Sequence, residues 1–251
     1  MMPFVQVYDS RSEDYRRAFA VFLAHTDEKQ VIRSWLAQLI DTLTAREVFI
    51  DAGAGTGQLT ARFQERFQRT IAIEPSPSLR PELERSCPGA ELLFQSILAA
   101  RPSANGDLVL CSHVLYYIPT ADWPRHLEQL ASWLAPQGVL AVLLQNADCA
   151  CTRLLEHFSG HRPDLLPLAD RFRADRGNQF HVQVERVPAV VWTPDLAAAY
   201  TVAEFMLNLL PQPRPIPRAE VEAYLHAHCI APDGGFRLSL DQDFLTIRRK
   251  G

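Results

Sequence analysis

The chain has 251 residues, of which 47% are hydrophobic and 22% charged, and its formal net charge is -4 at pH 7. This length suits one domain, or one domain with a modest appendage, and the composition is ordinary for a soluble globular protein. The slight negative charge excludes the strongly basic footprint of nucleic-acid binding proteins, so nucleic acid is not an expected partner.

Membrane and secretory segments are not expected either. The sequence contains no run of about 18 apolar residues, so no membrane-spanning helix is predicted. The first residues lead at once into a charged segment and lack a secretory pattern. The five cysteines show no framework spacing, which is typical of a reduced protein, and a cytoplasmic location is expected.

The N-terminal part, residues 1–44, is predicted to be a helical cap. Apolar residues recur at helical spacing between Glu13 and Leu43, with a break near residues 25–28. Thr26 or Asp27 suits the N-cap of a second helix after that break. The spacing therefore predicts two consecutive helices.

Residues 45–145 alternate between short apolar strands and helices. Strands are predicted over 48–52, 70–74, 90–94, 107–111 and 139–144, and helices over 59–67, 79–86 and 123–134. Strands joined through helices by short links imply βαβ units and a mostly parallel sheet. The fold class is therefore predicted to be α/β.

The C-terminal part, residues 146–251, has a different rhythm. It is predicted to contain a helix at 152–158, an Arg/Asp-rich stretch to Gly177, a strand at 180–187, an apolar helix at 196–210, a Pro-rich extended segment at 211–217, a helix at 218–228 and a last strand at 244–248. Roughly 35 residues follow the Pro-rich segment, too few for an independent core. One domain over residues 1–251 is therefore expected.

A glycine-rich turn follows the first predicted strand. Its residues 51–57 read Asp-Ala-Gly-Ala-Gly-Thr-Gly, so Gly53, Gly55 and Gly57 precede a helix. Glycines at this place permit a tight turn and let a ligand lie against bare backbone. The spacing does not fit the dinucleotide pattern G-x-G-x-x-G, because Gln58 stands at the sixth position, and the Gly-Lys-Ser/Thr of a P-loop is absent.

Glu74 ends the second predicted strand, 23 positions after Asp51. A carboxylate at the tip of this strand can accept hydrogen bonds from the vicinal hydroxyls of a ribose. The turn and the acid together predict a nucleoside-binding site.

These residues resemble the S-adenosylmethionine-dependent methyltransferases of the Rossmann-like class I, whose first motif is an apolar strand followed by D/E-x-G-x-G-x-G. The resemblance implies a seven-stranded, mostly parallel sheet flanked by helices, with the helical cap and a C-terminal insertion on the substrate side. It implies that S-adenosylmethionine is the cofactor and S-adenosylhomocysteine the product. Its implied contacts are Asp51, the three glycines, Glu74 and Pro75. Many members carry an acid after the third strand for the adenine amine. This chain has Gln95 and Ser96 there instead.

The loop after the fourth strand adds candidates beside the methyl group. In this family it faces both cofactor and substrate, which implies that Ser112 contacts the cofactor and that His113 acts on the substrate. For an acceptor that must lose a proton, His113 and Glu28 are the two candidate catalytic bases, the first because an imidazole titrates near neutral pH and the second by its position.

Two stretches are similar, more narrowly, to the histamine N-methyltransferases: residues 15–30 and Leu115-Tyr116-Tyr117. The similarity implies that the first helices cover the substrate and that Glu28 contacts its amine. An aromatic box around a flat acceptor is expected from Tyr15, Phe19, Phe22, Tyr116, Tyr117 and Trp192. Where those enzymes have an Asn before the last strand, this chain has Asp241-Gln242-Asp243, so an acceptor other than histamine is expected.

The sequence thus predicts methylation of a small molecule, most simply at the nitrogen of an amine or heterocycle in specialised metabolism. An O-methyltransferase and a catalytically inactive cofactor-binding protein are the alternatives. No metal is expected, because Cys149 and Cys151 have no second pair at zinc spacing. The expected state is a monomer or homodimer.

Overall fold

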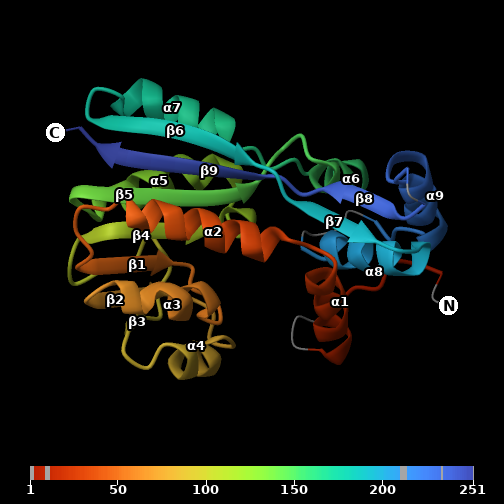
Figure 1. Cartoon of the computed structure of the whole chain (residues 1–251), viewed down its shortest axis with the longest axis horizontal. Coiled ribbons are helices and arrows are strands. Elements are labelled where there is room, and N and C mark those ends of the chain that lie inside the picture. The colour runs from red at the N-terminus through yellow and green to blue at the C-terminus, as the bar shows by residue number, and fades with distance from the viewer. Residues whose placement is uncertain (1–2, 9–11, 210–213, 233, 251) are drawn as a thin grey trace. The chain divides into compact units, whose positions relative to one another are not determined.

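The computed structural model describes residues 3–8, 12–209, 214–232 and 234–250 (Figure 1). Its contacts divide the chain into two compact units. Unit 1 comprises residues 1–32, 145–164 and 186–242, and unit 2 comprises residues 33–144, 165–185 and 243–251. No helix in the described ranges is long and apolar enough to cross a membrane.

A seven-stranded sheet forms the centre of unit 2, with strand order β3-β2-β1-β4-β5-β9-β6. β1 runs parallel to β2 and β4, β2 is parallel to β3, and β4 is parallel to β5. The arrow of β9 points against those of β5 and β6 in Figure 1. The strands are β1 (Val48–Ala52), β2 (Arg69–Ile73), β3 (Glu91–Leu93), β4 (Gly106–Ser112), β5 (Leu134–Gln145), β6 (Phe180–Val187) and β9 (Gln242–Arg249).

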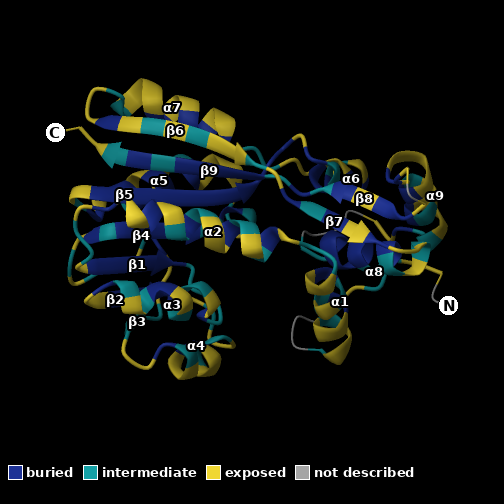
Figure 2. Cartoon of the chain, in the orientation of Figure 1, coloured by how far each residue is buried: buried dark blue, intermediate teal, exposed yellow. Residues whose placement is uncertain are grey.

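The central strands are buried on both faces, and their sequences are nearly continuous apolar runs for that reason. All five residues of β1 are buried, as are the last eight of β5 (Figure 2). The helices of this unit are the main part of α2 (Glu28–Asp41), with α3 (Gln58–Phe63), α4 (Arg80–Ser86), α5 (Trp123–Ser132) and α7 (Leu166–Arg176).

The strand order places a crossover beside β1. The chain moves outward from β1 to β2 and β3, then returns to β4 on the other side of β1. At such a switch point the loops after neighbouring strands turn away from each other, which opens a ligand crevice at the carboxyl ends of the strands. The glycine-rich turn after β1 and the loop after β4 lie at these ends.

Unit 1 is built from helices and a two-stranded antiparallel sheet. α1 (Glu13–Ala24) packs on α8 (Leu196–Leu207), and α8 also contacts α6 (Ala150–Ser159) and α9 (Arg218–His228). Strands β7 (Val190–Thr193) and β8 (Phe236–Ser239) pair with each other.

Most predicted elements are confirmed, and the exceptions lie mainly after residue 145. The Arg/Asp-rich stretch contains α7, because Leu168, Ala169 and Phe172 form a narrow buried stripe among its charges. β7 and β8 were not predicted. The helix predicted to reach residue 134 ends at Ser132, and β5 begins at Leu134. Residues 210–213 of the predicted apolar helix and Pro-rich segment lie outside the described residues.

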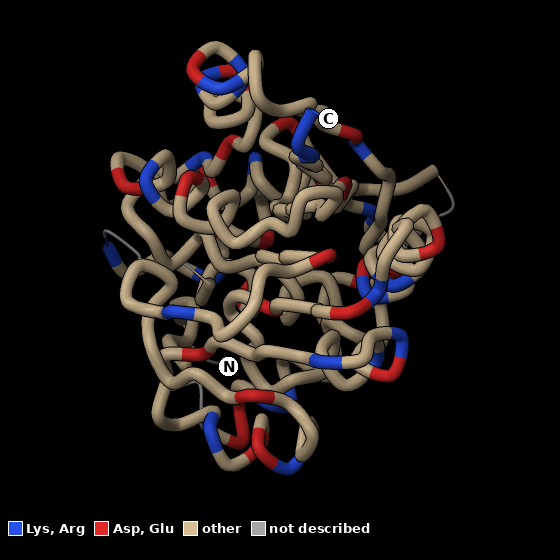
Figure 3. Tube along the Cα trace, turned by 90° about the vertical axis from the view of Figure 1, so that its left-hand side faces the viewer, with Lys and Arg blue, Asp and Glu red and all other residues tan. Residues whose placement is uncertain are grey.

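Charges of both signs are interspersed along the chain (Figure 3). Several arginines pair with acids close to them in sequence, for example Arg173 with Asp170 and Arg171 with Asp175. Exposed pairs of this kind contribute little stability. They agree with the modest net charge of -4.

Candidate functional site

The glycine-rich turn after β1 uses conformations that only glycine adopts easily. Gly53, Gly55 and Gly57 have φ angles of 96°, 60° and 82°. A Cβ on Gly53 would lie 2.2 Å from Cγ2 of Val114, and one on Gly57 would lie 2.9 Å from Sγ of Cys87. A Cβ on Gly55 would meet no atom within 4 Å. Gly53 and Gly57 are thus required by packing, whereas Gly55 leaves open space in front of the backbone.

Glu74 follows β2 directly and is only 7% exposed. One carboxylate oxygen accepts a hydrogen bond from the backbone N–H of Gly55 at 3.0 Å, and the other accepts one from the N–H of Ser76 at 2.8 Å. Each oxygen keeps further acceptor capacity, which two ribose hydroxyls need. The contact with Gly55 joins the predicted turn and the predicted acid into one site.

The buried side chain of Asp51 connects the start of the glycine-rich turn to α3. Its side chain is 2% exposed and accepts a hydrogen bond of 2.6 Å from the hydroxyl of Thr60 on α3. Burial raises the pKa of the Asp51 carboxyl to about 6, with the charge of Glu74 adding to the rise and the Thr60 hydrogen bond opposing it. The two acids therefore make this corner of unit 2 electronegative, which suits a ligand that carries positive charge.

The residues predicted at the adenine end are accessible. Pro75, Gln95 and Ser96 are all exposed. Arg80, which the sequence reasoning missed, lies with its guanidinium 4.4 Å above the ring of Phe94, the residue before Gln95. The sequence did not predict this pair, because an arginine over an aromatic ring has no short-range sequence signature. The fold brings together the start of α4 and the residue after β3.

His113 follows Ser112, the last residue of β4, and has a φ angle of 57°. It is the only non-glycine residue with a positive φ among the described residues, and such strained conformations cluster at functional sites. Its backbone N–H donates to the carbonyl of Leu143 at 3.0 Å. Its ring stacks on Tyr116 at 5.9 Å with an interplanar angle of 14°, whereas the next residue, Tyr117, is 74% exposed.

Glu28 begins α2 in unit 1 and is 6% exposed. Its backbone N–H donates to the hydroxyl of Thr26 at 3.2 Å, whereas the side chain of Asp27, directly before the helix, accepts from the backbone N–H of Val190. The Nζ of Lys29 lies 3.5 Å from the Glu28 carboxylate. Such deep burial is unusual for a carboxylate on a helix. Contact with an acceptor amine stays a prediction.

The aromatic residues predicted to surround the acceptor come from both units. Tyr15 and Phe19 stack on each other at 6.2 Å in unit 1, and both contact Phe205 of α8, at 5.6 and 5.4 Å. Trp192 lies on β7 with its backbone N–H donating to the carbonyl of His25. Tyr116 and Tyr117 belong to unit 2. Their common role as an aromatic box stays a prediction.

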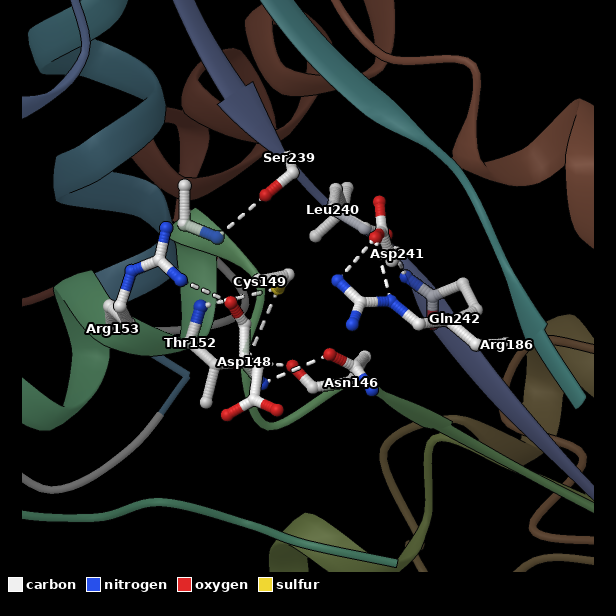
Figure 4. Close-up of polar contacts among 11 residues, drawn as sticks. Asn146, Asp148, Cys149, Thr152, Arg153, Arg186, Ser239, Leu240, Asp241 and Gln242 are labelled. Atoms are coloured by element: carbon white, nitrogen blue, oxygen red, sulfur yellow. Dashed lines mark hydrogen bonds and ion pairs between the residues drawn. The ribbon is translucent and has the colours of Figure 1, made fainter. Parts of the chain in front are cut away.

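The segment before the last strand is already hydrogen bonded within unit 1 (Figure 4). Asp241 accepts two hydrogen bonds from the guanidinium of Arg186, at 2.9 and 2.7 Å. The side-chain amide of Gln242 is buried and donates to the carbonyl of Leu240.

The sulfur of Cys149 accepts from the backbone of Thr152 at the start of α6. The described residues contain no group of three or more potential metal ligands.

Comparison with known proteins agrees with this arrangement. The family model described as a methyltransferase domain matches residues 23–188. A probable methyltransferase, ltbC of Aspergillus luteorubrus, is 26% identical over 147 residues, which cover 52% of this chain and 51% of that protein. Trans-aconitate 2-methyltransferase of Yersinia pestis (strain Pestoides F) is 27% identical over 125 residues, 49% of this chain and 48% of that protein. The chain spans about half the length of these curated relatives.

Solved structures share the fold at lower identity. N-methyltransferase NodS from Bradyrhizobium japonicum WM9, in complex with S-adenosyl-L-homocysteine, aligns with a TM-score of 0.55 and 15% identity over 96% of this chain and 100% of that one. The glycine-rich turn and strands β1 to β6 lie within the region that the family model matches. The chain therefore belongs to the methyltransferase domain family, in the Rossmann-like class I whose cofactor is S-adenosylmethionine.

Proposed function

We propose that the chain transfers a methyl group from S-adenosylmethionine to a small molecule, with the nitrogen of an amine or heterocycle as the acceptor atom. The observation that carries the proposal is the hydrogen bond between Gly55 and Glu74. It holds the glycine-rich turn and the ribose-binding acid together, and the space in front of Gly55 is open.

The residues of unit 2 fit this cofactor. Glu74 would accept hydrogen bonds from the ribose hydroxyls, and Gly53, Gly55 and Gly57 would lie under the methionine part. At the two ends, Pro75, Gln95 and Ser96 would contact the adenine, and Ser112 would lie near the sulfonium. When bound, S-adenosylmethionine supplies a methyl group activated by a positively charged sulfur. The buried acids Asp51 and Glu74 favour a ligand with positive charge.

On the acceptor side the chain must mainly orient one atom and exclude water. Orientation alone supplies several kcal/mol of the reduction in barrier. A base is needed only when the acceptor keeps a proton at neutral pH. We assign this role to His113, whose strained backbone and stacked ring fix it at the carboxyl end of β4.

A buried carboxylate favours nitrogen as the acceptor atom. Glu28 offers an acceptor of hydrogen bonds for a protonated amine or a ring N–H, in line with the likeness to the histamine N-methyltransferases. An oxygen acceptor is the second candidate. It is supported by the relative named trans-aconitate 2-methyltransferase, since trans-aconitate is a polycarboxylate. A role in specialised metabolism forms part of the proposal.

Calorimetric titration with S-adenosylmethionine and S-adenosylhomocysteine, with NADH as the control ligand, tests the cofactor. We expect binding of the first two and none of NADH. Glu74→Gln should weaken binding about 10- to 100-fold, because hydrogen bonds to a charged acceptor are lost. Glu82→Gln, at an exposed position on α4, is the matched control. No binding of either sulfur compound would overturn the proposal.

A panel of amines, heterocycles, phenols and carboxylates, assayed for release of S-adenosylhomocysteine, then tests the acceptor. Turnover confined to nitrogen compounds and sensitive to Glu28→Gln supports the N-methyltransferase. Turnover confined to carboxylates or phenols would establish the O-methyltransferase instead. Cofactor binding without turnover of any class would favour an inactive binding protein.

A further inference from the structure

An acid that the cofactor site does not use is buried in unit 1. Glu204 on α8 is 8% exposed. Its Oε1 accepts hydrogen bonds from the backbone N–H of Gln6 at 2.8 Å and the hydroxyl of Tyr200 at 2.9 Å. Its Oε2 accepts one from the hydroxyl of Tyr8 at 2.5 Å. A buried carboxylate is tolerable only with such a full set of donors.

Both tyrosines are held as donors. Burial first, and then the hydrogen bond to Glu204, raise the pKa of Tyr8 and of Tyr200 well above the usual 10. The two hydroxyls therefore keep their protons throughout the physiological pH range and can donate to the Glu204 carboxylate.

Residues 3–8, the N-terminal strap, are fixed along their backbone as well. Asn208, one turn after Glu204, accepts from the N–H of Tyr8 and donates to the carbonyl of Gln6, both at 2.8 Å. The N–H of Val5 donates to the carbonyl of Ile216 at 2.8 Å. Glu204 and Asn208 thus recognise the strap in the manner of a peptide-binding site, through its main chain.

The strap contacts α1 through a hydrogen bond from the side-chain amide of Gln6 to Asp14, at 3.1 Å, and through a ring contact. The ring of Tyr8 meets that of Tyr15 edge-on, at 6.5 Å and 77°. On its other side Tyr15 packs against Phe205, the neighbour of Glu204 in α8. Tyr15 is only partly buried and meets three rings, those of Tyr8, Phe19 and Phe205. Two of them depend on adjacent residues of α8, because Glu204 holds Tyr8 and Phe205 is its neighbour.

We infer that Glu204 is a positioning residue for the methyl acceptor, which acts by fastening Tyr8 behind Tyr15. The inference rests on the proposed function, in which Tyr15 contacts the acceptor. Glu204 touches neither cofactor nor acceptor in this scheme. Its effect therefore falls on the binding of the acceptor and leaves the affinity for the cofactor unchanged.

Two tyrosines on the same carboxylate provide a matched pair of variants. Tyr8→Phe removes the hydroxyl that fastens the strap but keeps the ring. Tyr200→Phe removes a hydrogen bond to the same carboxylate, but Tyr200 does not belong to the strap. Its ring lies under the guanidinium of Arg218, with Cζ 3.9 Å from the ring centroid. Both variants lose one hydrogen bond to a charged group and should lose similar stability. Glu204→Gln keeps one oxygen acceptor and should have a smaller effect than Glu204→Ala.

The first readout does not depend on activity. The six tyrosines are labelled as 3-fluorotyrosine, and the fluorine resonance of Tyr15 is assigned with Tyr15→Phe. Tyr8→Phe should shift or broaden this resonance, and Tyr200→Phe should leave it in place. An unmoved Tyr15 resonance in Tyr8→Phe overturns the inference.

The second readout is kinetic and uses the most active acceptor of the panel described above. Tyr8→Phe should raise KM for that acceptor about tenfold, and the Kd of S-adenosylhomocysteine should stay within about twofold. Equal kinetic effects of Tyr8→Phe and Tyr200→Phe would reduce Glu204 to a structural residue and overturn the inference. Failure of the wild-type chain to bind S-adenosylhomocysteine would instead overturn the proposed function.

Discussion

Asp51 in β1 and His113 after β4 each have a structural contact and a proposed chemical role. Asp51 is a first-motif acid by sequence, yet its side chain bonds to Thr60 inside the unit. His113 is a candidate base by its position, and its backbone conformation is the additional evidence. The two residues lead to separate predictions.

Asp51 should make stability depend on pH. Its folded pKa of about 6 lies above the ordinary 3.8, so the folded state favours the protonated acid. This contribution is fully present below about pH 4 and is lost as the pH rises through 6, by up to about 3 kcal/mol. Asp51→Asn keeps an acceptor for Thr60 and does not titrate. Its stability relative to the wild type should therefore increase between pH 4.5 and 7.5 in urea unfolding. A constant difference would show that the carboxyl does not titrate in this range.

His113 should be replaceable without loss of fold but not without loss of turnover. Asparagine also adopts positive φ readily, so His113→Asn should preserve stability and cofactor affinity. Removal of the imidazole should lower kcat about 100-fold or more for an acceptor that must lose a proton. Unfolding curves, calorimetry and initial rates separate these effects. A cofactor affinity that falls as far as kcat would place His113 at the cofactor instead.

At the scale of the element, the three glycines of the turn between β1 and α3 have different roles. Gly53 and Gly57 are limited by nearby side chains, and Gly55 faces open space. The turn is therefore held by packing at both ends and is available to a ligand in the middle.

Gly55→Ala should separate binding from folding. An alanine at positive φ costs about 1–2 kcal/mol of stability, and its Cβ would stand where we place the methionine part of the cofactor. Gly160→Ala at the end of α6 is the control, because its φ is 72° and a Cβ there also meets no atom within 4 Å. Both should lose similar stability, but only Gly55→Ala should lose cofactor affinity. Equal affinities would remove Gly55 from the site.

At the scale of the whole molecule, the chain passes several times between two compact units. Unit 2 holds the residues that we assign to the cofactor, whereas Glu28, Tyr15 and Phe19 belong to unit 1. This assignment predicts that the two units respond differently to ligands.

Hydrogen exchange should reveal that difference. S-Adenosylhomocysteine alone should protect amides in residues 53–57 and 74–76 and at Ser112, because these residues contact it in our proposal. Residues 13–24 of α1 should gain protection only when an acceptor from the panel is added as well. Protection of α1 by S-adenosylhomocysteine alone would contradict the assignment of that helix to the acceptor.

The sequence by itself determined the α/β class and the order of the central elements, and it supplied the candidate residues of the cofactor site. These depend on short-range patterns: apolar runs in strands, helical spacing between them, and the glycines and acid that follow β1 and β2. Only the tertiary structure decided the division into two units, the left-handed backbone of His113, the helical state of residues 166–176 and the bonds of Glu204 to Gln6 and Tyr8. The physical reason is sequence distance. Glu204 lies nearly 200 positions from its strap partners, and which distant segments share one acid is set by packing, which local periodicity does not encode.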